Sequence, residues 1–324
     1  MAEKFKTMIG GQALIEGIMM RGPEKDAIVT RNGEGVHVEV KPRKIRKKGS
    51  FATWPFIRGC VGFFDAQVAG VKALMRSADL SPEAQEEEPS KFDQWLEKKL
   101  GNKRFQNLVI GTAVALGLGF SILLFFFLPN FLASLFYGVV KHDLLRSLIE
   151  GAVRIAIFMA YMILVSRMKD MKRVFAYHGA EHKTIRCYEA GLPLTVENVR
   201  QQTRKHPRCG TSFLFVVMIL SILVFSTGTA LLGLIPGLEL LEGTLWYTLL
   251  LFCFKLLLLP IVVAIAFEIN RLVGRYDNWL TRLVTAPGQW FQNFTTNEPD
   301  DEMIEVGIAS LEAVLPEEEG ADRW

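Results

Sequence analysis

Residues 177–183 of the chain read YHGAEHK and lie in a polar segment between two apolar stretches, 144–166 and 211–235. Each apolar stretch approaches the roughly 20 residues that a helix needs to cross the ~30 Å hydrocarbon layer of a bilayer. Two similar stretches lie at 106–128 and 245–269. The sequence therefore predicts an α-helical integral membrane protein with about four transmembrane helices, whose histidine-rich segment lies in water between the second helix and the third.

The composition agrees with this class. Of the 324 residues, 50% are hydrophobic, which favours a membrane protein with aqueous parts. The formal net charge is +3, with basic residues concentrated at 41–48 and 167–208 and acidic residues at 83–88 and 298–319. Four cysteines without regular spacing do not form the disulfide framework of a small secreted domain. The sequence has no phosphate-binding loop of the G-x-x-x-x-G-K-S/T type, and we expect no nucleic-acid partner.

Loop charge predicts the orientation of the chain in the cell membrane. The loop 167–210 carries ten Lys and Arg residues, whereas 129–143 carries one and 236–244 carries none. Because basic loops stay on the cytoplasmic side, we expect the 167–210 loop and both termini to be cytoplasmic. The first residues lack an apolar signal-peptide core, which agrees with a cytoplasmic N-terminus.

The sequence predicts four parts. Residues 1–80 form a small, glycine-rich, β-containing domain in the cytoplasm or at the membrane surface, and 81–104 form an acidic linker followed by an amphipathic helix. Residues 105–275 form the four-span membrane domain. Residues 276–324 form a C-terminal cytoplasmic helix, from Asp300 to about Leu315, and an acidic tail.

Within the first part, two β-prone runs at 27–31 and 36–40 flank the turn sequence NGEG, which predicts a hairpin. The glycine-broken run 10–23 suits turns or close backbone approach. Residues 57–75 predict a helix that either lies in the membrane interface or packs on the hairpin, and both alternatives are open. Residues 130–140 are apolar but too short to cross, so they are either re-entrant or an extracytoplasmic interfacial helix.

Two further local patterns concern the basic segments. The run 41–48 has six basic residues in eight, which suits either a contact with anionic lipid headgroups or a solvated loop. In the 167–210 loop we expect a helix over 171–190 that could continue the second span and that ends at Gly191. Thr195 is then a good N-cap for a helix over 196–204.

The motif H-x-x-E-H indicates a metal site. Residues three and four apart share one face of a helix, so His178, Glu181 and His182 point into one small volume. Two imidazoles four residues apart suit a borderline-soft divalent ion, with zinc expected first. The carboxylate of Glu181 is either a third ligand or a general base that takes a proton from an activated water.

A second cluster, HPRCG at 206–210, offers His206 and Cys209. Two arrangements are open. In a closed structural site, His178, His182, His206 and Cys209 are four ligands that pin the loop to the third span. In a catalytic site, the histidines and a third ligand leave one position open, and Glu268 at the cytoplasmic end of the fourth span lies at the right membrane level to contribute.

Four passages together resemble a known family, namely GQALIEGIMMR at 11–21, HGAEHK at 178–183, HPRCGTSF at 206–213 and EPDDE at 298–302. They resemble the YqhQ family of bacterial membrane proteins, a domain of unknown function described as predicted metal-dependent enzymes. The resemblance covers nearly the whole chain and implies a protein of the bacterial inner membrane. It also implies metal binding by His178, Glu181, His182, His206 and Cys209.

Three functions fit these observations. The first is a cytoplasm-facing, metal-dependent membrane hydrolase that acts on a peptide or lipid-linked substrate. The second is a non-enzymatic scaffold or assembly factor with a structural metal and a membrane-protein partner. The third is a transporter, supported by charged residues inside the spans, namely Glu150, Arg154 and Lys255. The lipid bilayer is the expected partner of each, and four spans are compatible with a homo-oligomer.

Overall fold

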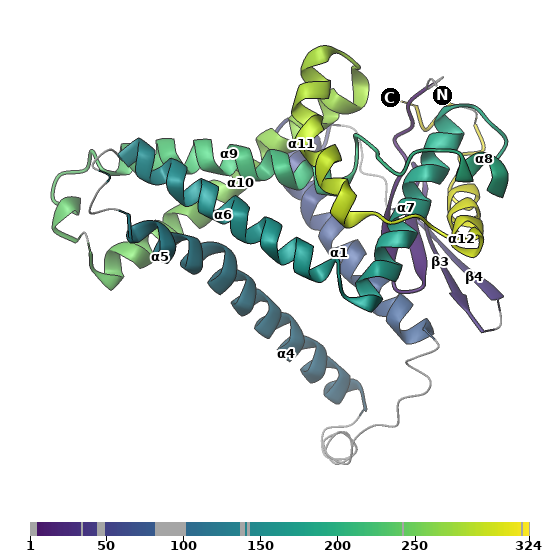
Figure 1. The fold of residues 1–324 in the computed structure, drawn as a ribbon, viewed down its shortest axis with the longest axis horizontal. Helices are drawn as coiled ribbons and strands as arrows, with labels where there is room; N and C mark the ends of the chain where they lie inside the picture. Colours follow the sequence, from purple (N-terminus) through teal and green to yellow (C-terminus); the bar gives the residue numbers. More distant parts are fainter. Residues whose placement is uncertain are drawn as a thin grey trace. The chain divides into compact units, whose positions relative to one another are not determined.

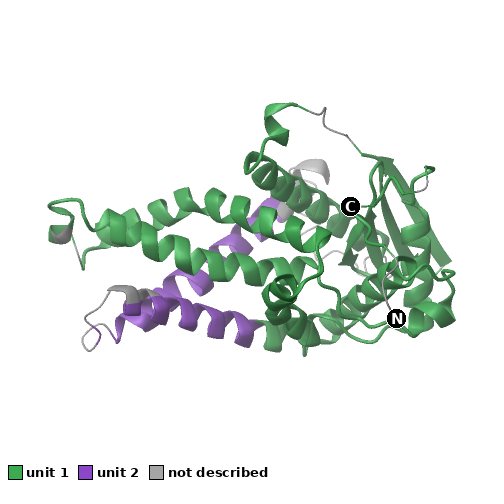
Figure 2. Ribbon diagram, turned by 90° about the horizontal axis from the view of Figure 1, so that it is seen from above, with its two compact units in different colours: residues 1–82, 162–324 green, residues 83–161 purple. Residues whose placement is uncertain are grey.

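The computed structural model describes residues 5–33, 35–43, 49–81, 102–136, 140, 143–241, 243–318 and 320–323. These residues are mostly helical, with a four-stranded antiparallel sheet near the N-terminus. The chain divides into two compact units, one formed by residues 1–82 with 162–324 and the other by residues 83–161 (Figure 2). The predicted linker and amphipathic helix within 82–101, and the basic residues 44–48, lie outside the described residues.

The sheet of the first unit is a simple meander. Its strands β1 (Gly10–Leu14), β2 (Gly17–Arg21), β3 (Lys25–Asn32) and β4 (Gly35–Pro42) pair in chain order. The predicted hairpin is the β3–β4 pair, in which Asn32 lies opposite Gly35. Gly35 has φ +125°, a conformation that favours glycine, so the turn sequence acts as expected.

The glycine-broken run does not predict the strands β1 and β2. On β1 only Leu14 is buried, so the apolar alternation of this strand is too weak to indicate it. Gly17 is the first residue of β2, and a Cβ atom there would overlap with the carbonyl oxygen of Val29 on β3. This glycine therefore serves a close approach between neighbouring strands rather than a turn.

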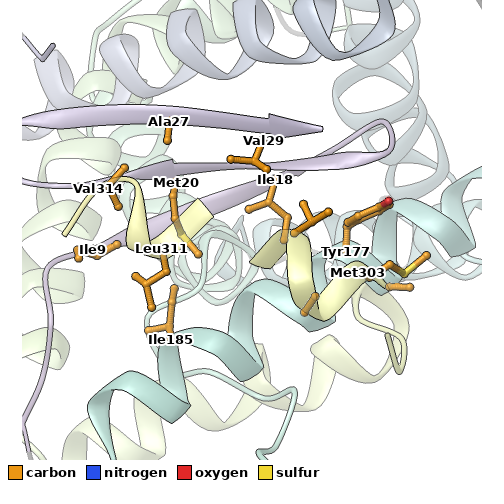
Figure 3. Packing of buried hydrophobic residues seen from close by; sticks show 13 residues of the cluster. Ile9, Ile18, Met20, Ala27, Val29, Tyr177, Ile185, Met303, Leu311 and Val314 are labelled. Carbon is orange, nitrogen blue, oxygen red and sulfur yellow. The ribbon is translucent and has the colours of Figure 1, made fainter. Parts of the chain in front are cut away.

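The main hydrophobic core lies between one face of the sheet and two helices, α7 (Lys169–Glu189) and α12 (Asp301–Glu312) (Figures 1 and 3). Alternate residues of β2 and β3 point into it, as the period of a strand requires. The labelled members of this core are Ile9, Ile18, Met20, Ala27, Val29, Tyr177, Ile185, Met303, Leu311 and Val314. The predicted C-terminal helix is thereby confirmed as a packing element, and Asp300 caps it by accepting a hydrogen bond from the amide of Met303.

The opposite face of the sheet packs on α1 (Ile57–Leu80), where Leu14, Met19 and Ala73 form a second small core. The helix predicted at 57–75 is therefore confirmed, and it packs on the sheet. Its place in the membrane interface stays a prediction. A row of large apolar side chains on α1, which includes Phe64, Val68 and Val71, remains exposed.

The helix α7 carries the H-x-x-E-H motif and is separate from the second span. The helix α6 (Asp143–Val165) ends before a short turn, and α7 begins at Lys169, so the two are not one continuous helix. After α7 the chain turns at Gly191, which has φ +63°. Thr195 caps α8 (Val196–Arg200), as predicted, although α8 is shorter than the expected 196–204.

Two helices of the first unit are long and apolar enough to span a membrane, α9 (Gly210–Leu232) and α10 (Leu245–Arg275). They pack on each other, and α1 packs on α10. A helix that the sequence does not predict, α11 (Trp279–Thr295), packs closely on α9. A Cβ atom on Gly288 of α11 would overlap with the Cα atom of Ser212, so glycine permits this contact.

The second unit contains α4 (Asn102–Ile122), a π-helical segment (Leu123–Phe127), α5 (Leu128–Ser134) and most of α6. The spans run over 111–134 and 148–165, so the first extends beyond the predicted end at 128 into the stretch 130–140. Arg154 pairs with Glu150 at 2.6 Å and donates to the carbonyl of Phe125 at 3.1 Å. Phe125 lies in the π-helical segment, and the two charges compensate each other as expected.

Substitution of Gly179 tests the packing that holds α7. A Cβ atom at Gly179 would overlap with the carbonyl oxygen of Asn297, and backbone cannot rotate away. We expect Gly179→Ala to destabilise the protein by about 1–3 kcal/mol or more, because it overpacks a tight contact. Gly117→Ala is the control, because nothing lies within 4 Å of its Cβ position. Thermal unfolding of both variants in detergent checks this, and equal melting temperatures would contradict the close approach.

Cysteine labelling tests the orientation. We expect Leu240→Cys, at a side chain that is 82% exposed, to react with a membrane-impermeant maleimide in intact cells. Gln201→Cys should react only after the cells are permeabilised, because the basic loop stays in the cytoplasm. The parent protein, with its own four cysteines, gives the background. Labelling of Gln201→Cys in intact cells would reverse the orientation.

Candidate metal centre

Three of the predicted ligands lie together. His178 and His182 project from the same face of α7, and Cys209 precedes the first turn of α9. Their ligand atoms all lie within 4.8 Å of one another, and the Nε2 atom of His178 is 3.1 Å from the Sγ atom of Cys209. Two imidazoles and a thiol at this spacing could hold one divalent ion.

Backbone carbonyls orient both histidine rings. The Nδ1 atom of His178 lies 2.8 Å from the carbonyl oxygen of Thr295, and the Nδ1 atom of His182 lies 2.5 Å from that of Arg204. Because a carbonyl can only accept, each Nδ1 atom carries the proton. Each Nε2 atom of a neutral ring then presents its lone pair, which is the arrangement found for histidine ligands of metals.

His178 and Cys209 shift each other's pKa in opposite directions, which favours a metal-binding thiolate at Cys209. Burial raises the pKa of the Cys209 thiol, but the two facing imidazoles outweigh it, and the net pKa lies well below the usual value. Burial lowers the pKa of His178, but the facing Cys209 outweighs it, and the net pKa is about 9. Near neutral pH the pair is therefore a thiolate and an imidazolium that share one proton.

Glu181 lies beside these ligands and is buried. Its Oε1 atom accepts a hydrogen bond of 2.9 Å from the amide of Gly11 on β1. Among the described residues, its Oε2 atom and the Nε2 atom of His182 have no hydrogen-bond partner. Burial raises the pKa of Glu181, although His182 and His178 oppose the shift. A buried carboxylate with one free oxygen is suited to exchange a proton with a bound molecule.

A cavity of about 250 Å³ adjoins the ligands. Residues on β1, β2, α7 and α9, and residues next to β1, β4 and α9, line it, namely Met8, Ile9, Gly10, Gly11, Arg21, Arg43, Glu181, His182, Ile185, His206, Arg208, Cys209 and Gly210. A second cavity, of about 330 Å³, is lined in part by Tyr276 and Arg282 and contains none of the predicted ligands.

The other two predicted ligands lie outside the group of three. The Nε2 atom of His206 lies 3.4 Å from Glu189 and 3.3 Å from Arg208, and burial lowers the pKa of the ring well below its usual value. Both carboxylate oxygens of Glu268 accept hydrogen bonds from Arg58, at 2.7 and 2.5 Å. Metal binding by His206 or Glu268 stays a prediction.

Sequence reasoning missed the groups that position the ligands. The amide of Gly11 and the carbonyls of Thr295 and Arg204 belong to the backbone and leave no side-chain signal. One signal was present: glycines indicate close backbone approach. A Cβ atom on Gly11 would stand 3.0 Å from the carboxyl carbon of Glu181, so the strand can lie against the motif only without a side chain.

In the described part of the chain, four apolar helices fit a multi-pass membrane protein, and His178, His182 and Cys209 form a candidate metal centre. Residues 54–317 match the family model described as "Protein of unknown function (DUF1385)", and the chain belongs to this family. It is 33% identical over 317 residues to the "Uncharacterized protein YqhQ" of Bacillus subtilis (strain 168), covering 96% of this chain and 93% of the relative. The resemblance seen in the sequence is thereby confirmed. No solved structure matches.

Proton release tests whether a metal ion binds to both His178 and Cys209. His178, with a pKa of about 9, must lose its proton to bind a metal, whereas Cys209 is already a thiolate. We therefore expect the metal-free protein to release about one proton per zinc ion bound near pH 7.5, and affinity to rise with pH up to about 9. Calorimetry in buffers of different ionisation enthalpy measures this number. Zinc binding without proton release would contradict metal binding by this pair.

Proposed function

We propose that the protein is a metal-dependent membrane enzyme, and specifically a hydrolase. One observation carries this proposal: the Oε2 atom of Glu181 and the Nε2 atom of His182 are buried without a partner among the described residues, beside a cavity. Unpaired buried polar atoms cost about 1–3 kcal/mol each, so their presence together indicates a site built for ligands.

The open arrangement is favoured over the closed structural one. A closed site needs four protein ligands, and the fourth candidate, His206, directs its Nε2 atom toward Glu189 and Arg208. Three ligands beside a cavity leave room for a substrate. The two nitrogens and one sulfur form a borderline-soft donor set, for which zinc is the expected ion.

The residues around the site have separate roles in the proposed reaction. A bound divalent ion would supply Lewis acidity, polarising a substrate oxygen or a water. Glu181 accepts the proton of the attacking water through Oε2, while the amide of Gly11 fixes its other oxygen. The carbonyls of Thr295 and Arg204 hold the two rings in the tautomer that binds metal.

The position of the centre supports a substrate at the membrane surface. Cys209 immediately precedes α9, a candidate span, so the ligands lie at the end of a membrane helix. The basic loop that contains both clusters favours the cytoplasmic face of the cell membrane. A lipid-linked or membrane-associated substrate would reach the cavity there.

Paired substitutions separate an enzyme from a scaffold. Glu181→Gln keeps the size of the side chain but cannot take a proton, so metal content should stay near the parent value while function is lost. His182→Ala removes a ligand, so metal and function should fall together. Metal content by mass spectrometry and complementation of a strain that lacks the protein give the two readouts.

His206→Gln distinguishes the closed site. If the site has three protein ligands, this variant should keep its metal, provided that it folds as judged by thermal unfolding. If it loses the metal while Glu181→Gln retains both metal and function, the centre is structural and the scaffold is the better description. If none of the variants alters metal content, the proposed centre is wrong.

A further inference from the structure

Arg208 brings an unsatisfied positive group to the same cavity. Its side chain is only 8% exposed, and its Nη2 atom donates to the fully buried Glu189. Its Nη1 atom is buried and has no hydrogen-bond partner within the described part of the chain. Arg208 is one of the residues that line the cavity, and a buried guanidinium nitrogen without an acceptor indicates a ligand with acceptor oxygens.

Two further arginines line this cavity, Arg21 from β2 and Arg43 after β4. Arg21 pairs with Asp26 at 3.3 Å, and Arg43 donates to the carbonyl of Gly22 at 3.0 Å. Both therefore have anchored positions while lining the cavity. The three arginines of the lining face Glu181 and the Cys209 thiolate, and Asp26 and Glu189 pair with Arg21 and Arg208. The unpaired Nη1 atom of Arg208 is therefore the group that favours an anion.

We propose that this cavity binds the phosphoryl group of the substrate, with Arg208 Nη1 as the buried contact and Arg21 and Arg43 nearer the surface. Guanidinium groups from three separate segments can reach several oxygens of a tetrahedral phosphoryl group, whereas a planar carboxylate has only two. The first residue of α9, Gly210, also lines the cavity, and a helix N-terminus favours the same charge.

This inference rests on the proposed function, because a bound phosphoryl group is part of a substrate only if the site is that of an enzyme. The binding of phosphate itself depends on the arginines. The phosphoryl group could belong to a phospholipid headgroup, because the cavity lies next to the start of a candidate span. It could also belong to a soluble phosphate ester, which has the same phosphoryl chemistry.

Calorimetry on the full-length, detergent-solubilised protein tests the inference, with inorganic phosphate as the probe. Arg208→Lys keeps a charge for Glu189 but removes the second nitrogen, so phosphate should bind roughly 10-fold or more weakly. Arg43→Gln changes an exposed side chain, so the fold should be preserved while binding weakens several-fold. Arg282→Gln, in the other cavity, is the matched control and should leave affinity unchanged.

Several outcomes would overturn the inference: no phosphate binding by the parent, equal binding of acetate, or full affinity in both Arg208→Lys and Arg43→Gln.

Metal content measured on the same samples keeps the two proposals apart. If the parent protein contains no metal but binds phosphate through Arg208, only the metal centre is refuted. If the parent protein contains metal but does not bind phosphate, only this inference is refuted. Tighter binding of short-chain phosphatidic acid than of glycerol phosphate would identify a lipid headgroup, and the reverse a soluble ester.

Discussion

The burial of α7 is the constraint on which the rest of the structure depends. This helix has a polar sequence, yet it packs against the sheet and α12, and twelve of its residues are buried. Each buried polar side chain therefore needs a partner. Lys183 donates to the carbonyl of Arg200 and pairs with Glu298, Thr184 donates to the carbonyl of Ala180, and Glu189 pairs with Arg208. Among the described residues, three of the six buried side-chain atoms without a partner, on Glu181, His182 and Arg208, belong to residues that line one cavity.

These unsatisfied groups differ in charge. Glu181 Oε2 and His182 Nε2 can accept a proton or hold a cation, whereas Arg208 Nη1 can only donate. A site that combines a cation-binding group with a guanidinium suits a substrate whose anionic oxygens contact both. The glycines at 11 and 179 allow the backbone to approach α7 closely enough to enclose these groups.

The sequence predicts the parts of this fold that depend on local pattern. The four spans follow from apolar length, the β3–β4 hairpin from its turn, and the C-terminal helix from the period of its apolar residues. It does not predict β1 and β2, because their glycines serve contacts with distant segments, nor α11, whose interior contains Pro287. For the site, spacing predicts that His178, Glu181 and His182 share one face of a helix. Cys209 is expected near them because it ends the same loop, directly before the third span. The roles of Gly11 and Arg208 depend on tertiary contacts that spacing does not encode.

X-ray absorption spectroscopy at the zinc edge of the purified, full-length protein identifies the ligands of the proposed metal centre. The expected first shell holds two histidine nitrogens, one cysteine sulfur and one light ligand that exchanges with added anions, in agreement with the three grouped protein ligands and the adjoining cavity. A metal-free protein that fails to take up zinc, or a shell of four protein ligands that does not exchange, would contradict the open metal centre.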